Sequence, residues 1–153
     1  GVIGFSAGGH LASTISTHYA DKVYDVKDNV SARPDFSLLI YPVITMDTTF
    51  THRGTRNNLI GLDPTEKNVF RFSNEKQITG DTPPAFLVHS SDANAVPVKN
   101  SINYYMGLQK NKIPTELHIF QKGGHGYGLS PNGGTESSWP GLCIKWLKAM
   151  GLI

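Results

Sequence analysis

Apolar runs of strand length alternate along the chain with stretches of helical periodicity. The expected strands are residues 1–5, 36–41, 85–89 and 116–120, and the expected helices are residues 8–20, 64–72, 97–110 and 137–150. Because strand–helix alternation favours parallel pairing, this pattern predicts an α/β fold with a mostly parallel sheet flanked by helices.

Helical spacing also predicts an apolar side for three of these helices. The residues at this spacing are Leu11, Ala12 and Ile15 in the first helix, Ile102, Tyr105, Met106 and Gln109 in the third, and Trp139, Leu142, Trp146 and Leu147 in the last. The second helix has a start signal instead, with Asp63 as an N-cap and Pro64 at its first position.

A long polar segment, residues 43–61, follows Pro42, which stops the second strand. A loop of this length in a compact domain is usually functional. Its basic residues His52, Arg53 and Arg56 have two interpretations that the sequence leaves open, contact with a substrate and a solvated loop.

Composition narrows the class of protein. With 153 residues, 39% hydrophobic and 17% charged, the chain suits one globular domain or a large part of one. A net charge of +2 with scattered basic residues gives no indication of a nucleic-acid or membrane partner. The single cysteine, Cys143, lies in an apolar stretch and is expected to be a buried core thiol.

The first candidate for chemistry is the run Gly4-Phe5-Ser6-Ala7-Gly8, which fits the pattern G-x-S-x-G. In this pattern a strand turns sharply into a helix and exposes a serine hydroxyl at the apex, the nucleophile elbow of α/β-hydrolases. We expect both flanking glycines to be required, because a Cβ at either would clash across the turn. The strand that carries the elbow begins at the first residue of the chain.

Two further residues of the right type follow later strands. Asp92 comes after the third strand and His125, within Gly124-His125-Gly126, after the fourth. The carboxyl ends of parallel strands meet at one edge, so Ser6, Asp92 and His125 are expected to lie together there, in the chain order of this fold. Asp81 precedes its strand and lies at the wrong end.

This combination suits acyl transfer. A histidine takes the proton of the serine, a carboxylate fixes the histidine tautomer, and backbone N–H groups stabilise the oxyanion. The Ala7 N–H is the expected first donor, and a loop after an earlier strand is expected to supply the second. No cofactor or metal is expected, because His10, His18, His89 and His118 lack zinc-site spacing.

Each catalytic assignment has a simpler structural alternative. Ser6 and His125 also fit as ordinary turn and loop residues, and Asp92 also fits as a turn or helix-cap residue ahead of Pro97. Separately, each motif is weak; their order after successive strands is what favours the catalytic interpretation.

The chain resembles serine esterases of the α/β-hydrolase superfamily, in particular bacterial acetyl-xylan and feruloyl esterase-like enzymes. The similarity is carried by residues 4–13, by Tyr41-Pro42-Val43, by residues 51–59, by residues 96–101 and by residues 122–126. The resemblance implies Ser6 as nucleophile, His125 as base and Asp92 as orienting acid. Many relatives carry two adjacent acidic residues at the last position, whereas Ala93 follows Asp92 here.

From the resemblance we expect residues 1–153 to be the C-terminal part of an α/β-hydrolase domain, with N-terminal strands missing and the first strand at an exposed edge. The oxyanion-hole motif of the family would then precede Gly1. The implied activity is hydrolysis, through an acyl-enzyme, of an ester between a small acyl group such as acetate and a carbohydrate alcohol, for example acetylated xylan. A prolyl-oligopeptidase-like peptidase, which shares the Asp-x-x-x-Val-Pro context, and a non-catalytic binding module are the alternatives.

Overall fold

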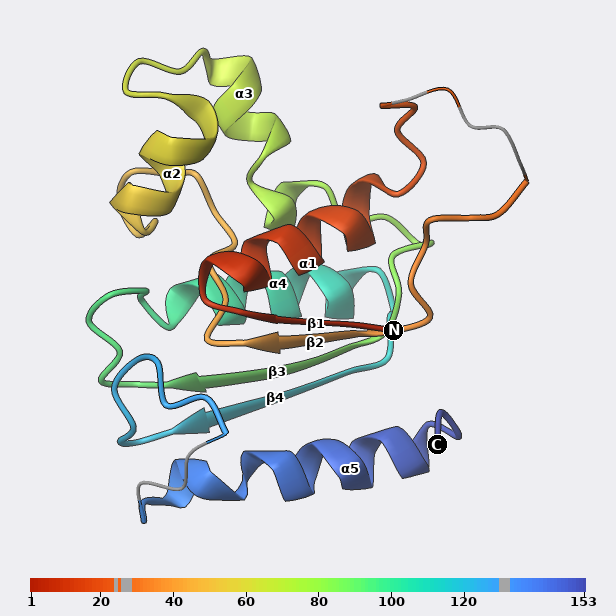
Figure 1. Cartoon of the computed structure of the whole chain (residues 1–153), viewed down its shortest axis with the longest axis vertical. Helices are drawn as coiled ribbons and strands as arrows, with labels where there is room; N and C mark the ends of the chain where they lie inside the picture. Colours follow the sequence, from red (N-terminus) through yellow and green to blue (C-terminus); the bar gives the residue numbers. More distant parts are fainter. Residues whose placement is uncertain (24, 26–28, 130–132) are drawn as a thin grey trace.

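A parallel sheet of four strands forms the centre of the molecule (Figure 1). The computed structural model describes residues 1–23, 25, 29–129 and 133–153. The strands are β1 (Val2–Phe5), β2 (Ser37–Ile40), β3 (Ala85–Ser90) and β4 (Thr115–Phe120), and they pair in chain order. The predicted parallel sheet is therefore confirmed, as is the position of the first strand at an edge of the sheet.

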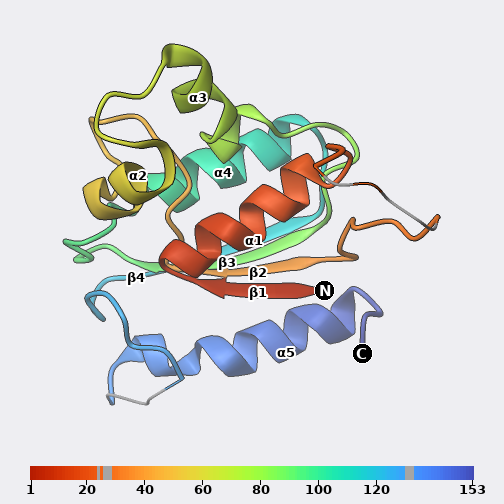
Figure 2. The ribbon, with the colours of Figure 1, turned by 45° about the horizontal axis from the view of Figure 1, so that its top comes forward.

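Helices cover both faces of the sheet, as expected. The helices are α1 (Ala7–His18), α2 (Arg53–Ile60), α3 (Glu66–Arg71), α4 (Lys99–Lys110) and α5 (Trp139–Ala149), with 3₁₀ turns η1 (Asn74–Lys76) and η2 (Thr135–Ser138). Figures 1 and 2 show α1 and α4 on one face and α5 alone on the other. In Figure 1, α2 and α3 lie beyond α1 and α4, farther from the sheet.

Alternate residues along the strands supply two separate cores. Leu39 and Leu87 pack with Tyr104 and Leu108 of α4 on one face. On the other face, buried residues of the sheet pack with α5; this cluster contains Ile40, Tyr41, Phe86, Val88, Tyr127, Trp139, Cys143 and Trp146. Because both faces are buried, the central strands contain continuous apolar runs. The expectation of a buried, free Cys143 is confirmed.

The segment 43–61 was predicted as a loop, and this is wrong for its second half, which forms α2. His52 caps this helix, its Nδ1 accepting the Thr55 N–H at 3.2 Å. The helix buries no side chain, so it has no apolar periodicity to indicate it. The next helix, α3, begins two residues after Pro64 and is capped by Thr65 rather than Asp63.

In two helices, some of the residues predicted to face the core are exposed. In α1, Ala12 is buried but Leu11 is 72% exposed. In α4, Met106 is 60% exposed, and Tyr104 and Leu108 face the core instead. Helical spacing defines a stripe but not which stripe meets the sheet, and here tertiary packing selects the neighbouring one. The stripe of α5, by contrast, faces the core as predicted.

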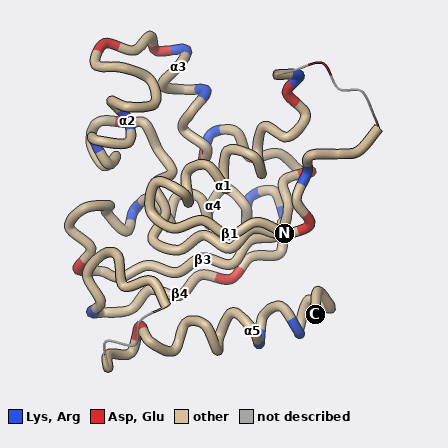
Figure 3. The backbone as a smooth tube through the Cα atoms, viewed as in Figure 1, with Lys and Arg blue, Asp and Glu red and all other residues tan. Residues whose placement is uncertain are grey.

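Charged residues are scattered over the described part of the chain, and Figure 3 shows no extended stretch of one sign. Within the same residues, no helix combines the length and the apolar composition that crossing a membrane requires.

Candidate active site

Ser6 lies at the turn between β1 and α1 in a backbone conformation that non-glycine residues rarely adopt, with φ 52° and ψ −118°. Such conformations cost about 1–3 kcal/mol and persist only where neighbours hold them. Here the Ser6 N–H donates to Ile40 O at 3.1 Å, and Ser6 O accepts the N–H groups of Gly9 and Val43 at 3.0 Å each. Strand β2 and its following loop therefore fix the strained serine.

The glycines of this turn have different roles. A Cβ on Gly4 would collide with the backbone of Gly8, as predicted. The same prediction for Gly8 is wrong, because a Cβ there would meet nothing within 4 Å. The close approach is instead at Gly9, where a Cβ would lie 2.6 Å from Pro42 Cβ. The helix thus needs its second glycine, not its first, to pack on the loop after β2.

The structure brings Ser6 and His125 together. Ser6 Oγ lies 2.8 Å from His125 Nε2, across 119 residues of sequence. When Nε2 is unprotonated the hydroxyl donates to it, which is the arrangement that a general base requires. Gly124 and Gly126, with φ 62° and 85°, flank the histidine in conformations that favour glycine. Burial, and secondarily the charge of His52, hold the pKa of His125 below its ordinary value of 6.5.

Tyr41 is a neighbour of His125, and the sequence pattern assigned it no role. It follows β2 with φ 38°, another strained non-glycine conformation. Its ring lies 4.8 Å from the His125 ring, and its hydroxyl accepts the Gly128 N–H at 2.9 Å. Tyr41 therefore holds both the imidazole and its loop. Its only signal in the sequence was its place in the Tyr-Pro-Val run.

Asp92 lies beside the histidine loop, at the predicted edge of the sheet. Its Oδ1 accepts the Gly124 N–H at 2.8 Å, and its Oδ2 is 3.8 Å from Lys122 Nζ. The carboxylate thus bonds to the residue before His125. Among the described residues, His125 Nδ1 is buried and has no hydrogen-bond partner. The structure therefore joins Ser6 to His125 directly, and Asp92 to the loop of His125 rather than to its ring.

A second buried histidine supports the loop that carries Asp92. His89, at the end of β3, donates from Nε2 to Val96 O at 2.9 Å, so that Nδ1 accepts from Ser101 Oγ at 2.8 Å. Burial lowers the pKa of His89 to about 4, and the nearby His125 contributes in the same direction. His89 is therefore neutral near pH 7 and ties the loop after β3 to α4.

The other histidines have structural contacts. His10 Nε2 donates to Phe72 O at 2.8 Å, and His118 Nε2 lies 2.6 Å from Glu116 Oε1. Over the residues that the structure describes, no three histidine, cysteine, aspartate or glutamate side chains gather as a metal site would need.

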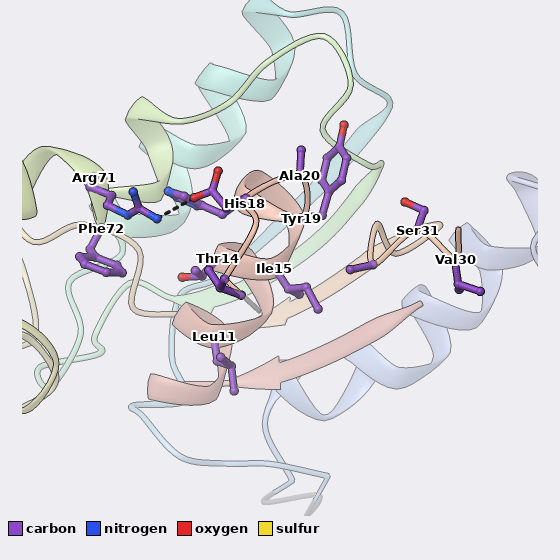
Figure 4. A pocket seen from close by; sticks show the side chains of 13 residues that line it. Leu11, Thr14, Ile15, His18, Tyr19, Ala20, Val30, Ser31, Arg71 and Phe72 are labelled. Carbon is purple, nitrogen blue, oxygen red and sulfur yellow. Dashed lines mark hydrogen bonds and ion pairs between the residues drawn. The ribbon is translucent and has the colours of Figure 1, made fainter. Parts of the chain in front are cut away.

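Two hollows lie near α1. The first, about 450 Å³, adjoins the residue after the serine and is lined by Ala7, His52, Gly54, Thr55, Asn58 and Leu59. The second, about 630 Å³, runs along the exposed side of α1, where Leu11, Ile15 and Tyr19 line it (Figure 4). Neither Ser6 nor His125 lines the second hollow. Of these two, the first is the nearer to Ser6 in sequence, because Ala7 directly follows the serine.

A serine held in a strained turn after one parallel strand, facing a histidine in the loop after another, defines this molecule as part of the α/β-hydrolase class. The fold expectation is supported by comparison with solved structures. The crystal structure of the acetyl ester-xyloside bifunctional hydrolase from Caldicellulosiruptor lactoaceticus superposes with a TM-score of 0.93 at 44% identity, covering all of this chain and 57% of that one.

The chain belongs to the prolyl oligopeptidase family, whose sequence profile matches residues 1–147. An acetylxylan esterase from Xylanibacter ruminicola is 38% identical over 84% of this chain, and endo-1,4-beta-xylanase B from Butyrivibrio fibrisolvens is 37% identical over 92% of it. This chain spans 26% and 22% of those two proteins, respectively. The carboxylesterase Cest-2923 from Lactobacillus plantarum superposes with a TM-score of 0.81 at 25% identity, covering 99% of this chain and 58% of that one.

Proposed function

We propose that Ser6, His125 and Asp92 are the catalytic residues of a serine esterase that deacetylates a carbohydrate ester. The observation that carries this proposal is the 2.8 Å contact between Ser6 Oγ and His125 Nε2 at a strained elbow. The names of the acetylxylan esterase and of the acetyl ester-xyloside hydrolase support the substrate class.

The reaction begins when Ser6 Oγ attacks the ester carbonyl carbon and its proton moves to His125 Nε2. The bond between the carbonyl carbon and the alcohol oxygen then breaks, and His125 returns the proton to the departing alcohol. Water repeats the sequence on the acyl-enzyme, so that acetate leaves and Ser6 is restored.

The oxyanion formed in each step needs a donor, and we assign this role to the Ala7 N–H. It starts α1, where the first N–H groups of a helix have no partner within it. Among the described residues, no backbone or side-chain acceptor takes this N–H. One such donor contributes roughly 100–1,000-fold in rate.

Asp92 acts in this proposal as the acid that stabilises the protonated imidazole. Its bond to the Gly124 N–H keeps the carboxylate next to the residue that precedes His125. In this role the carboxylate accepts a hydrogen bond from His125 Nδ1, which has no partner among the described residues. Catalytic hydrogen bonds often tighten only when substrate is bound.

Substitution in the purified full-length protein tests the assignment. Ser6→Ala is expected to reduce hydrolysis of p-nitrophenyl acetate at least about 1,000-fold, and Asp92→Asn to reduce it by a comparable factor. Ser137→Ala, which changes an exposed serine, is the control and should leave the rate unchanged. Hydrolysis by Ser6→Ala at the control rate would contradict the proposal.

The family match favours one alternative, a serine peptidase that uses the same residues. A panel of peptide p-nitroanilides, including prolyl substrates, separates the two activities. Cleavage of the anilides with a kcat/KM above that for acetyl esters would assign the chain to a peptidase and would leave the roles of Ser6 and His125 unchanged.

A further inference from the structure

Helix α2 and its N-cap residue present a stripe of side chains of which none is buried in the core. The helix buries no residue, and His52, Thr55, Asn58 and Leu59 follow one another at intervals of three, three and one. That spacing places them on one side of the helix. All four line the 450 Å³ hollow, whose opposite wall includes Ala7. The stripe therefore faces the elbow rather than the core.

This hollow opens beside the reacting atoms. Ala7 directly follows the proposed nucleophile, and its N–H is the proposed oxyanion donor. His52 is near enough to His125 for its charge to depress the pKa of that histidine. In Figures 1 and 2, α2 lies beyond the start of α1, toward the carboxyl ends of the strands. A group bound in the hollow is thus adjacent to a carbonyl carbon at Ser6.

The lining combines apolar surface with unused polar groups. Leu59 and Ala7 supply the apolar part. Among the described residues, the Asn58 side chain has no hydrogen-bond partner, and it is exposed. His52 accepts the Thr55 N–H at Nδ1, so in its neutral form the ring carries its hydrogen on Nε2, which the described residues leave available as a donor.

We propose that this hollow holds the carbohydrate alcohol of the ester, with Asn58 and His52 hydrogen-bonding its hydroxyl groups and Leu59 packing on its C–H face. The inference rests on the proposed esterase function. An acetyl group has no hydroxyl groups for Asn58 and His52, whereas a sugar ring offers both hydroxyls and an apolar face. The volume lies within the range of about 300–1,000 Å³ that small-molecule sites occupy.

Asn58→Ala tests the subsite, because it removes a hydrogen-bonding group on which no described residue depends. The substrates are an acetylated xylo-oligosaccharide and p-nitrophenyl acetate, whose alcohol has no sugar hydroxyls. We expect kcat/KM to fall about 3–10-fold for the oligosaccharide, as for one lost hydrogen bond, and less than about 2-fold for the aryl ester.

Asn57→Ala is the matched control, since it makes the same chemical change one residue earlier on α2 but outside the lining of the hollow. It should leave both substrates unaffected. Equal losses on both substrates with Asn58→Ala, or no loss on the oligosaccharide, would overturn the inference.

A binding measurement separates this inference from the proposed function. Calorimetric titration with the deacetylated xylo-oligosaccharide needs no turnover. Affinity that weakens about 3–10-fold in Asn58→Ala, but not in Asn57→Ala, would support the subsite even if the full-length protein hydrolysed neither ester. Equal affinity in both variants would overturn the subsite even if Ser6-dependent hydrolysis were found.

Discussion

The imidazole of His125 is held on two sides, by the Ser6 hydroxyl and by the Tyr41 ring. It is half-buried, and its pKa lies below 6.5, chiefly because burial disfavours the charged form. His125 can act as the proposed general base only when its imidazole is neutral, so this function is available above its pKa and is lost as the pH falls through it.

The pH dependence of kcat/KM for p-nitrophenyl acetate follows from this environment. We expect activity to decline on the acid side with a midpoint below pH 6.5. Since kcat/KM reports the free enzyme, the midpoint belongs to the unliganded site. A midpoint above pH 7 would contradict this description and would indicate that a carboxylate already pairs with the imidazole before substrate binds.

Tyr41→Phe removes one hydroxyl and leaves the ring on His125 in place. The Gly128 N–H then loses its acceptor, which costs about 1–3 kcal/mol in the free energy of unfolding. The loop of His125 loosens, so kcat should also fall severalfold. The control is Tyr105→Phe, whose hydroxyl makes no hydrogen bond to described residues. Urea unfolding measures the stability of the two variants, and ester hydrolysis measures their kcat. Equal stability and equal kcat in the two variants would contradict the positioning role of Tyr41.

At the same scale, the sequence predicted some site residues and missed others. Ser6 and His125 meet as expected, because each follows a strand whose carboxyl end is at the same edge. Tyr41 and His89 were not assigned a role in the site. Their roles depend on contacts with Gly128 and Val96 that arise only from the packing of loops, and no local motif encodes those contacts.

At the scale of elements, the elbow depends on how closely α1 approaches the loop after β2. The backbone of Gly9 is in contact range of Pro42, and the Ser6 carbonyl accepts the Val43 N–H. The same loop thus limits the position of α1 and supports the strained serine. Gly8, one residue earlier, faces open space.

The two glycines therefore make a matched pair of substitutions. Gly9→Ala should destabilise the protein by about 1–3 kcal/mol, because its Cβ would lie 2.6 Å from Pro42 Cβ. Gly8→Ala should have no cost and should gain up to about 1 kcal/mol from helix propensity. Urea unfolding of both variants checks this difference. If Gly9→Ala were as stable as Gly8→Ala, the close packing of α1 on this loop would be refuted.

Elements with a buried apolar face could be predicted from their periodicity, whereas an exposed helix needed another signal: α3, which buries no residue, was predicted from the start signal at Pro64, and α2 had none. The four strands and α5 match the sequence pattern because burial imposes apolar runs on the strands and an apolar stripe on the helix. The sequence pattern predicts a loop at helix α2, because the residues of this helix face a hollow and solvent, where nothing imposes an apolar stripe. Helix α2, which the sequence pattern did not indicate, therefore carries the inferred carbohydrate subsite.

At the scale of the whole molecule, the parallel sheet brings the loops after all four strands to one edge. Ser6, Tyr41, Asp92 and His125 come from these four loops in chain order. Residues distant in sequence therefore meet without any long-range motif, which is why a site could be predicted from strand positions. The chain spans just over half of the solved hydrolases that it matches, so the acyl and alcohol specificity of the whole protein is a proposal.

The central claim is that Ser6 carries the acyl group during turnover. The most direct measurement mixes the full-length protein with p-nitrophenyl acetate, quenches with acid within the first turnovers, and locates the modification by peptide mass spectrometry. We predict one added acetyl group on Ser6, absent from Ser6→Ala. Rapid hydrolysis without any acetylated Ser6, or with the acetyl group on another residue, would contradict the account.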